Sequence, residues 1–355
     1  MGFQVGEWAD SFTMAALGII AYLIGGSMTT RQLKCMGDII IGATLGQSIG
    51  ALLFVFVGTW WLLNLLSHTA ALPLALALSV LAISTAPAAT LALIHQYRAK
   101  GPMTDSLLGV VALDDAVGII CLSLLLAFSN NHLLSAGLTT AGWEIGGAIL
   151  LGAISGWLLS KVSTLFGESG LRLPLLLSAI LLILGIAHSL EFSLLLGSMS
   201  LGFFSRHFSR ASASRLFTPI YRLEETIYLL FFTIAGTHFD YAIFQQYLGL
   251  ILIYVFTRLA GKVIGSAIGT HAVKAPATIV RWLGLALVPQ AGVAVGLALI
   301  LSQQSAYLEM GEMIVNIVIG ATLIHELFGP LAAQLALKRA GEIGIKRKRH
   351  HHEGF

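Results

Sequence analysis

Residues 109–120 read GVVALDDAVGII and place two adjacent aspartates, Asp114 and Asp115, in the middle of an apolar stretch from 105 to 128. A helix of about 20 apolar residues, rising ~1.5 Å per residue, crosses the ~30 Å hydrocarbon core of a bilayer. A charge at the bilayer centre costs roughly 2.5 to 3.5 kcal/mol even on lenient insertion scales, so such groups normally face a bundle interior and pair. This stretch therefore predicts a membrane helix that carries a functional site.

The rest of the chain has the composition of an integral membrane protein. Of its 355 residues, 57% are hydrophobic and 10% are charged, and the mean hydropathy is +0.87, whereas about 25% of residues in soluble domains are charged. A secreted, nucleic-acid-binding or disordered protein is thereby excluded. Two cysteines, Cys35 and Cys121, are too few for a disulfide framework. The sequence has no GxGxxG motif and no P-loop, so we expect no nucleotide, no cofactor and no enzymatic activity.

Eleven apolar stretches are candidate membrane spans. They lie at 11–28, 39–63, 73–95, 105–128, 142–160, 173–189, 192–205, 217–236, 244–270, 276–302 and 311–336. We expect residues 1–337 to form one all-α transmembrane domain in the lipid bilayer, and residues 338–355 to form a basic tail that contacts anionic lipid.

The basic residues between these stretches fix an expected topology. Eighteen of the 20 lysines and arginines fall in alternate connections or within six residues of them, while the remaining connections carry acidic residues and no Lys or Arg. Because positively charged loops stay on the cytoplasmic side, we expect the N-terminus outside, the C-terminus in the cytoplasm and an odd number of spans.

The two remaining basic residues lie inside a span. Residues 254–269, YVFTRLAGKVIGSAIG, place Arg258 and Lys262 on one helix face. Counting the helical rise from the cytoplasmic ends puts Asp114 about 14 Å deep and Lys262 about 18 Å deep, so these two can pair, and Arg258 matches less well. Since adjacent residues point about 100° apart, one aspartate can be held by a cation while the other faces a water-filled cavity and binds a small cation or a proton.

Two spans contain a proline near the middle. Residues 81–94 read LAISTAPAATLALI around Pro87, and residues 285–298 read LALVPQAGVAVGLA around Pro289 and Gln290. Proline removes a backbone donor and clashes with the preceding turn. In transporters, such broken helices point their ends at a binding site near the bilayer midplane.

The surroundings of the prolines repeat. Pro87 precedes Asp114 by 27 residues, and Pro289 precedes Asn316, which we place in the middle of the last span, by the same number. Glycines spaced by four, which allow close helix approach, occur in the second and ninth spans: Gly42, Gly46 and Gly50, and Gly261, Gly265 and Gly269. Residues 39–128 and 244–336 thus form an inverted repeat, an architecture of secondary transporters.

These motifs resemble the monovalent cation:proton antiporter superfamily, which includes bacterial sodium/proton antiporters and Kef-type potassium/proton systems. Residues 84–120, STAPAATLALIHQYRAKGPMTDSLLGVVALDDAVGII, resemble its first broken helix and double-aspartate helix; RLAGKVIG (258–265) resembles its lysine helix, and GLALVPQAGVAVGLAL (284–299) its second broken helix. The resemblance implies a sodium/proton antiporter-like fold with two broken crossing helices, a homodimer and a bacterial inner membrane. It also implies that the first two helices of the family are missing.

The resemblance further implies roles for individual residues. Asp115 matches the obligatory carrier of the cation and the proton, and Asp114 matches the aspartate that pairs with the lysine, here Lys262. Arg258 matches a basic position common in this branch and is a second candidate ion-pair partner. The polar positions that help to line the ion site are Ser84 and Thr85. Members with two aspartates are typically electrogenic, exchanging two protons for each sodium ion.

Three alternatives differ in class. A sodium-coupled organic-anion symporter of related fold is disfavoured by the paired aspartates. An intramembrane aspartyl protease needs its two aspartates on facing helices, and these two are adjacent on one helix. A membrane subunit without transport remains open. The sequence does not fix which of Na⁺, Li⁺ or K⁺ is transported.

Overall fold

A computed structural model describes residues 7–27, 37–67, 69–86, 90, 93–94, 96–130, 134–165, 171–209, 213–221, 223–237, 239–290 and 292–343. Every regular element in these residues is a helix. In order they are α1 (Glu7–Ser27), α3 (Gly37–Leu65), α4 (Ala71–Leu81), α6 (Pro102–Asn130), α7 (Leu134–Leu165), α8 (Arg172–Ser189), α9 (Leu194–Ser209), α10 (Ala213–Tyr221), α11 (Glu224–Thr237), α12 (Tyr241–Gln246), α13 (Leu248–Ala272), α14 (Ala277–Ala286), α15 (Gly292–Ser302), the 3-10 helix η2 (Ser305–Met310) and α16 (Gly311–Arg339).

Six stretches are long and apolar enough to cross a membrane. They are Gly37–Leu65, Pro102–Ser129, Gly142–Thr164, Arg172–Ser189, Leu248–Ala272 and Ser305–Arg339. Shorter apolar helices cover Ser11–Gly26, Ala71–Leu81, Ala277–Ala286 and Gly292–Ser302. Each of the eleven expected spans contains at least one helix, and together they make a multi-pass membrane protein.

Two expected spans are divided differently in the structure. The stretch 217–236 forms two helices, because α10 contains Pro219 and ends at Tyr221. The stretch 244–270 begins within the short helix α12 and continues as α13. The carboxylate of Asp240 caps α12 by accepting hydrogen bonds from the backbone N–H groups of the next turn. Apolar composition alone marked the stretches but not these breaks.

Helix ends that were expected on the same side of the membrane meet. Arg206 near the end of α9 donates a hydrogen bond of 2.5 Å to the carbonyl oxygen of Gly26 near the end of α1. At the opposite side, the hydroxyls of Ser129 at the end of α6 and Tyr307 in η2 lie 3.0 Å apart. These contacts fit helices that run alternately up and down.

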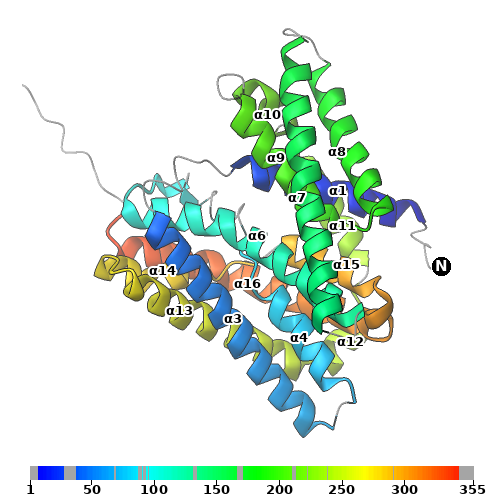
Figure 1. Cartoon of the computed structure of the whole chain (residues 1–355). Coiled ribbons are helices and arrows are strands. Elements are labelled where there is room, and N and C mark those ends of the chain that lie inside the picture. The colour runs from blue at the N-terminus through cyan, green and yellow to red at the C-terminus, as the bar shows by residue number, and fades with distance from the viewer. Residues whose placement is uncertain are drawn as a thin grey trace, which may run out of the picture.

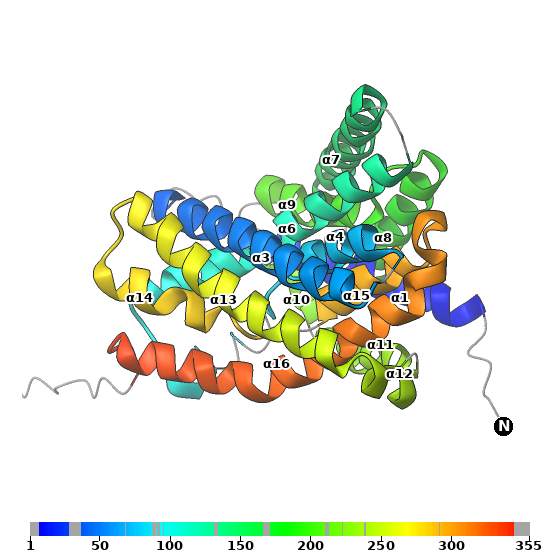
Figure 2. The same cartoon turned by 90° about the horizontal axis from the view of Figure 1, so that it is seen from below.

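Helices α3 and α13 run side by side along their lengths (Figure 2). Their contact consists of three glycine pairs in opposite chain order: Gly42 with Gly269, Gly46 with Gly265, and Gly50 with Gly261. A Cβ atom on any of these six glycines would overlap a carbonyl oxygen of the facing helix, so the two backbones touch directly. This contact joins the second span to the ninth, the first helices of the two expected repeat units.

Many of the helices form two groups, with α6 between them (Figure 1). One group contains α3, α13, α14 and α16, and the other contains α7, α8, α9 and α10 with part of α1. The second group has its own buried apolar cluster around Tyr22, Leu176, Ile180 and Phe217. The double-aspartate helix therefore lies where the two groups meet.

Candidate ion-binding site

The two proline-containing spans are both broken, and their breaks cross. Helix α4 ends at Leu81, and residues 84–86 belong to no regular element. On the other side, α14 ends at Ala286 and α15 begins at Gly292. The backbone N–H of Ala86 donates a 3.0 Å hydrogen bond to the carbonyl oxygen of Pro289. The expected pair of broken crossing helices is therefore present; Pro87 itself lies outside the described residues.

Arg258 of α13 holds both breaks in place. Its guanidinium donates to the carbonyl oxygens of Ala82 (2.9 Å) and Ser84 (2.6 Å) after α4, and of Val288 (2.7 Å) after α14. The side chain is fully buried. The end of a helix carries partial negative charge on its free carbonyls, which favours a cation there. Arg258 thus satisfies backbone groups that the breaks leave open.

The expected pairing of Arg258 with an aspartate does not occur in the part of the chain that the structure covers. The ion pair at the crossing joins Lys262 and Asp114. The physical reason is that the broken helices present several free carbonyls at the level of Arg258, and its fork of N–H donors fits them.

Lys262 lies one turn further along α13 and connects the break to α6. Its Nζ donates to the carbonyl oxygen of Ile83 (2.6 Å) and to Thr85 Oγ1 (2.7 Å), and it lies 3.5 Å from Asp114 Oδ2. The Thr85 hydroxyl in turn donates to the same carboxylate oxygen of Asp114. Because 3.5 Å is long for a direct hydrogen bond, much of the link between Lys262 and Asp114 runs through Thr85.

Asp115 has no such partner. Both of its carboxylate oxygens are buried without a hydrogen-bond partner among the described residues, and its side chain is 0% exposed. The expectation that the second carboxylate faces an open, water-filled cavity is therefore not met in this conformation, in which Asp115 is enclosed. A buried carboxylate without a partner is costly, so its position favours binding of a proton or a cation.

Ser84 is the polar side chain placed beside this part of α6. A Cβ atom on Gly118, one turn after Asp114, would lie 3.0 Å from Ser84 Oγ. The Ser84 hydroxyl is buried and has no hydrogen-bond partner in the residues described. It is close enough to Asp115 to act on that carboxylate.

Gln290 completes the crossing, with a partner that the sequence analysis missed. Its Nε2 donates to the carbonyl oxygen of Leu81 (3.1 Å) and to the hydroxyl of Tyr254 (2.8 Å). Tyr254 precedes Arg258 by four residues, so the spacing that puts neighbours on one helix face could have identified it. Backbone carbonyls, by contrast, leave no signal in side-chain identity.

Asn316, which follows Pro289 by 27 residues, lies near the start of α16. It lies in the second turn of α16, not in the middle, and accepts a 2.6 Å hydrogen bond from the backbone N–H of Asp240. Asn316 and Asp114 each follow their proline by 27 residues. In the second case, η2 and its flanking turns lie within this interval, so α16 begins only shortly before Asn316. Equal spacing from the proline therefore does not give equal positions within α6 and α16, and the inverted repeat stays a prediction.

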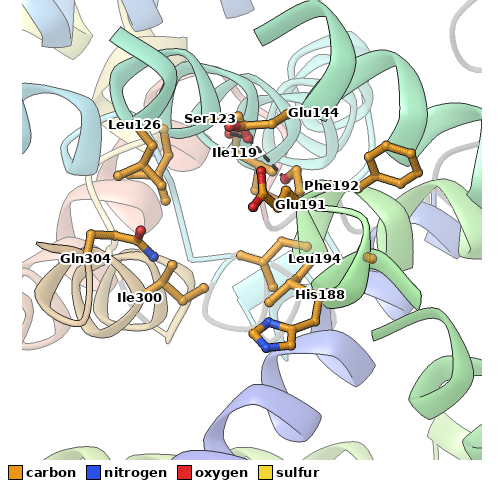
Figure 3. Close-up of a pocket in the computed structure, with 14 residues that line it drawn as sticks. Ile119, Ser123, Leu126, Glu144, His188, Glu191, Phe192, Leu194, Ile300 and Gln304 are labelled. Carbon is orange, nitrogen blue, oxygen red and sulfur yellow. Dashed lines mark hydrogen bonds between the residues drawn. The ribbon is translucent and has the colours of Figure 1, made fainter. Parts of the chain in front are cut away.

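A cavity of about 580 Å³ lies where α6 meets α7, α9 and α15 (Figure 3). Its wall includes Glu144 and Glu191, whose carboxylates lie on the same side of the cavity near Ser123. Ile119, which also lines it, is one turn after Asp115 on α6. The cavity is at the end of α6 that we expect to be outside, and it approaches the enclosed carboxylate from that side.

The solved structures that share this fold include two of one archaeal protein. The sodium proton antiporter MjNhaP1 from Methanocaldococcus jannaschii at pH 8 matches with a TM-score of 0.78 and 18% identity, over 94% of this chain and 88% of that one. The three-dimensional electron-microscopy map of MjNhaP1 gives a TM-score of 0.66 and 19% identity, over 93% and 85% of the two chains. No curated protein sequence matches this chain significantly.

The sequence itself supplies the family. The family model described as sodium/hydrogen exchanger, transmembrane, matches residues 2–338, which include both broken helices, the double aspartate and the lysine helix. The chain therefore belongs to the family of transmembrane sodium/hydrogen exchangers.

Proposed function

We propose that this protein is a secondary-active antiporter that exchanges a monovalent cation, Na⁺, Li⁺ or K⁺, for protons, and that Asp115 carries both. The observation that carries the proposal is the enclosed carboxylate of Asp115, which lacks a hydrogen-bond partner in the described structure, beside an aspartate that is already paired. Membership of the exchanger family and the shared antiporter fold support it.

The charges around the site explain how two different ions can take turns. With Asp115 ionised, the two aspartates balance Arg258 and Lys262. A proton on Asp115, or a monovalent cation bound to it, adds the same single positive charge. The net charge of the site is therefore the same with a proton or with a cation bound. The Asp115 carboxylate, which has no hydrogen-bond partner among the described residues, binds only one of them at a time. Competition for one group couples the two fluxes.

Asp114 and Lys262 form a second protonatable pair. Their link runs partly through Thr85, so the pair can take up or release a proton, which changes its net charge, without dismantling the crossing. A cycle that also protonates this pair moves two protons against one cation and is electrogenic. The cavity that reaches Ile119 would give Asp115 access to the outside, and rearrangement of the two helix groups would give access to the cytoplasm. In this proposal the protein works as a homodimer in a bacterial inner membrane.

Proton movement in proteoliposomes tests the proposal. The purified protein is reconstituted with a pH-sensitive dye inside, and LiCl, NaCl, KCl or RbCl is added outside. We expect at least one salt to drive proton movement, and Asp115→Asn to abolish it. Asp105→Asn is the matched control, because Asp105 is an exposed acid on the same helix.

Each outcome is informative. Exchange that persists in Asp115→Asn contradicts the site. Wild-type protein that moves no protons with any cation points to a membrane subunit without transport. Sodium uptake that needs an organic anion points to a symporter. A membrane potential set by valinomycin and K⁺ changes the rate of Na⁺ exchange only if the cycle is electrogenic.

A further inference from the structure

The double-aspartate helix begins at a residue that cannot cap it. The carbonyl oxygen of Gly101 accepts a 3.0 Å hydrogen bond from the backbone N–H of Asp105, which makes Gly101 the N-cap residue of α6, and Pro102 is the first helical residue. The N–H groups of the next residues, Met103 and Thr104, need an acceptor that an Asp, Asn or Ser cap would normally provide. Glycine has no side chain to provide it.

Glu342, about 240 residues later in the chain, provides the acceptor. One carboxylate oxygen accepts from the backbone N–H of Met103 (2.8 Å), and the other accepts from the backbone N–H (2.7 Å) and the hydroxyl (2.6 Å) of Thr104. Glu342 is 8% exposed. Its negative charge lies at the positive end of the α6 dipole, where an anion is stabilised.

The end of α16 is built to aim Glu342 at this point. Gly341 adopts the left-handed conformation (φ 76°), and its N–H donates to the carbonyl of Lys338 while the N–H of Glu342 donates to that of Leu337, both at 3.1 Å. This pattern is a Schellman motif, and the residue after its glycine usually makes an apolar contact with the helix. Here that residue is a buried glutamate.

Space for the carboxylate comes from the missing side chain of Gly101. A Cβ atom there would overlap the carboxyl group of Glu342. The backbone N–H of Lys100 also donates to the Glu342 carbonyl oxygen at 3.4 Å. Gly101 thus has two effects. It provides no side chain to cap α6, and its lack of a side chain leaves room for the Glu342 carboxylate to do so.

We propose that Glu342 is a positioning residue for transport: it anchors the cytoplasmic end of α6 to the end of α16 and so sets the height and rotation of Asp114 and Asp115 relative to Lys262. The inference rests on the proposed function of those aspartates. Helix α6 is continuous from Pro102 to Asn130, and Asp114 lies about 15 Å along it from Thr104. A shift of its first turn is therefore transmitted to the site. Glu342 lies beyond residues 2–338 that the family model matches.

Two variants and one control separate positioning from a simple structural contact. Glu342→Gln removes the charge and replaces one acceptor oxygen by an NH₂ group. Thr104→Val removes only the hydroxyl donor. Asp38→Asn removes an exposed acid from the first turn of α3 and leaves the α6 cap intact. All three are reconstituted at equal amounts of folded protein.

We expect Glu342→Gln to change the cation concentration for half-maximal exchange by about three- to tenfold, which corresponds to the usual energy of an N-cap, and to shift the pH profile of exchange. Thr104→Val should act in the same direction but less strongly. The double variant should fall short of the summed effects, because both changes act on one contact. Asp38→Asn should match the wild type.

Hydrogen–deuterium exchange of the peptide covering residues 101–108 reads the cap directly. Glu342→Gln should raise deuterium uptake there, and unchanged uptake overturns the capping contact. Raised uptake with wild-type half-maximal concentration and pH profile makes Glu342 a structural contact only, and overturns the inference alone. A wild-type protein without exchange overturns the proposed function and the inference with it. If Glu342→Gln fails to fold, Thr104→Val carries the same comparison.

Discussion

Replacing Lys262 by methionine tests the centre of the site most directly. Methionine keeps the length of the side chain but removes the ammonium group that contacts the carbonyl of Ile83, the hydroxyl of Thr85 and the carboxylate of Asp114. All these groups are buried. Breaking a buried ion pair by removing one partner costs about 3 to 5 kcal/mol, because the other charge stays behind. We expect the free energy of unfolding to fall by about 4 kcal/mol on this basis.

The double variant Asp114→Asn with Lys262→Met separates the charge from the packing. It removes both charges, and the amide oxygen of the new asparagine can still accept from Thr85. Because replacing both members of a buried pair is far less costly than removing one, we expect the double variant to regain about 2 to 3 kcal/mol relative to Lys262→Met.

Thermal unfolding in detergent, followed by size-exclusion chromatography of heated samples, measures these differences. A loss of about 4 kcal/mol in a chain of this size lowers the midpoint by on the order of 5 °C. Lys161→Met is the control, since Lys161 is exposed on α7. If Lys262→Met melts with the wild type, or if adding Asp114→Asn lowers the midpoint further, the buried pair does not stabilise the crossing and the reasoning is refuted.

Three further substitutions test the scaffold in the same melting assay. Gly265→Ala should lower stability by about 2 kcal/mol or more, because its Cβ would overlap the carbonyl of Gly46. Gly249→Ala on the same helix is the control: its Cβ meets no atom within 4 Å, so the change should be neutral or stabilising. Equal midpoints for the two variants would contradict the close contact. Arg258→Lys should lose about 2 kcal/mol, since one ammonium cannot match three carbonyls; a wild-type midpoint would mean that the three bonds do not stabilise the breaks. Gln290→Leu should cost about 1 to 3 kcal/mol by leaving buried polar partners unsatisfied, and an unchanged midpoint would argue against that contact.

Much of the fold follows from two simple properties of the sequence. Apolar length marks each expected span, and the alternation of basic connections orders their directions, so helix ends meet as expected at Gly26 with Arg206 and at Ser129 with Tyr307. Proline chemistry marks the two broken helices. These signals are local, and they survive folding because lipid leaves the backbone few alternatives to the helix.

The part of the site that depends on side-chain identity and depth in the membrane could be predicted from the sequence. Counting helical rise places Asp114 opposite Lys262, and their charged atoms lie 3.5 Å apart. The same count could not show that Arg258 binds carbonyl oxygens, because every residue has a carbonyl and only the crossing of two breaks exposes these. Glu342 was out of reach for a similar reason: its partners are backbone N–H groups far away in the sequence.

The backbone contact between α3 and α13 has a mechanical consequence. Side chains can slide past one another by changing rotamers, but the six glycines of this contact have no side chains to rearrange, and carbonyl oxygens fill the space between them. The pair is therefore stiff, and Lys262, which belongs to α13, is fixed to it. Movement between helices therefore has to occur at other contacts. The seam around the 580 Å³ cavity, where α6 meets α7 and α9, is such a contact, because the cavity leaves space between the helices. In the proposed transport cycle the two helix groups move against each other at this seam, along the helix that carries Asp114 and Asp115.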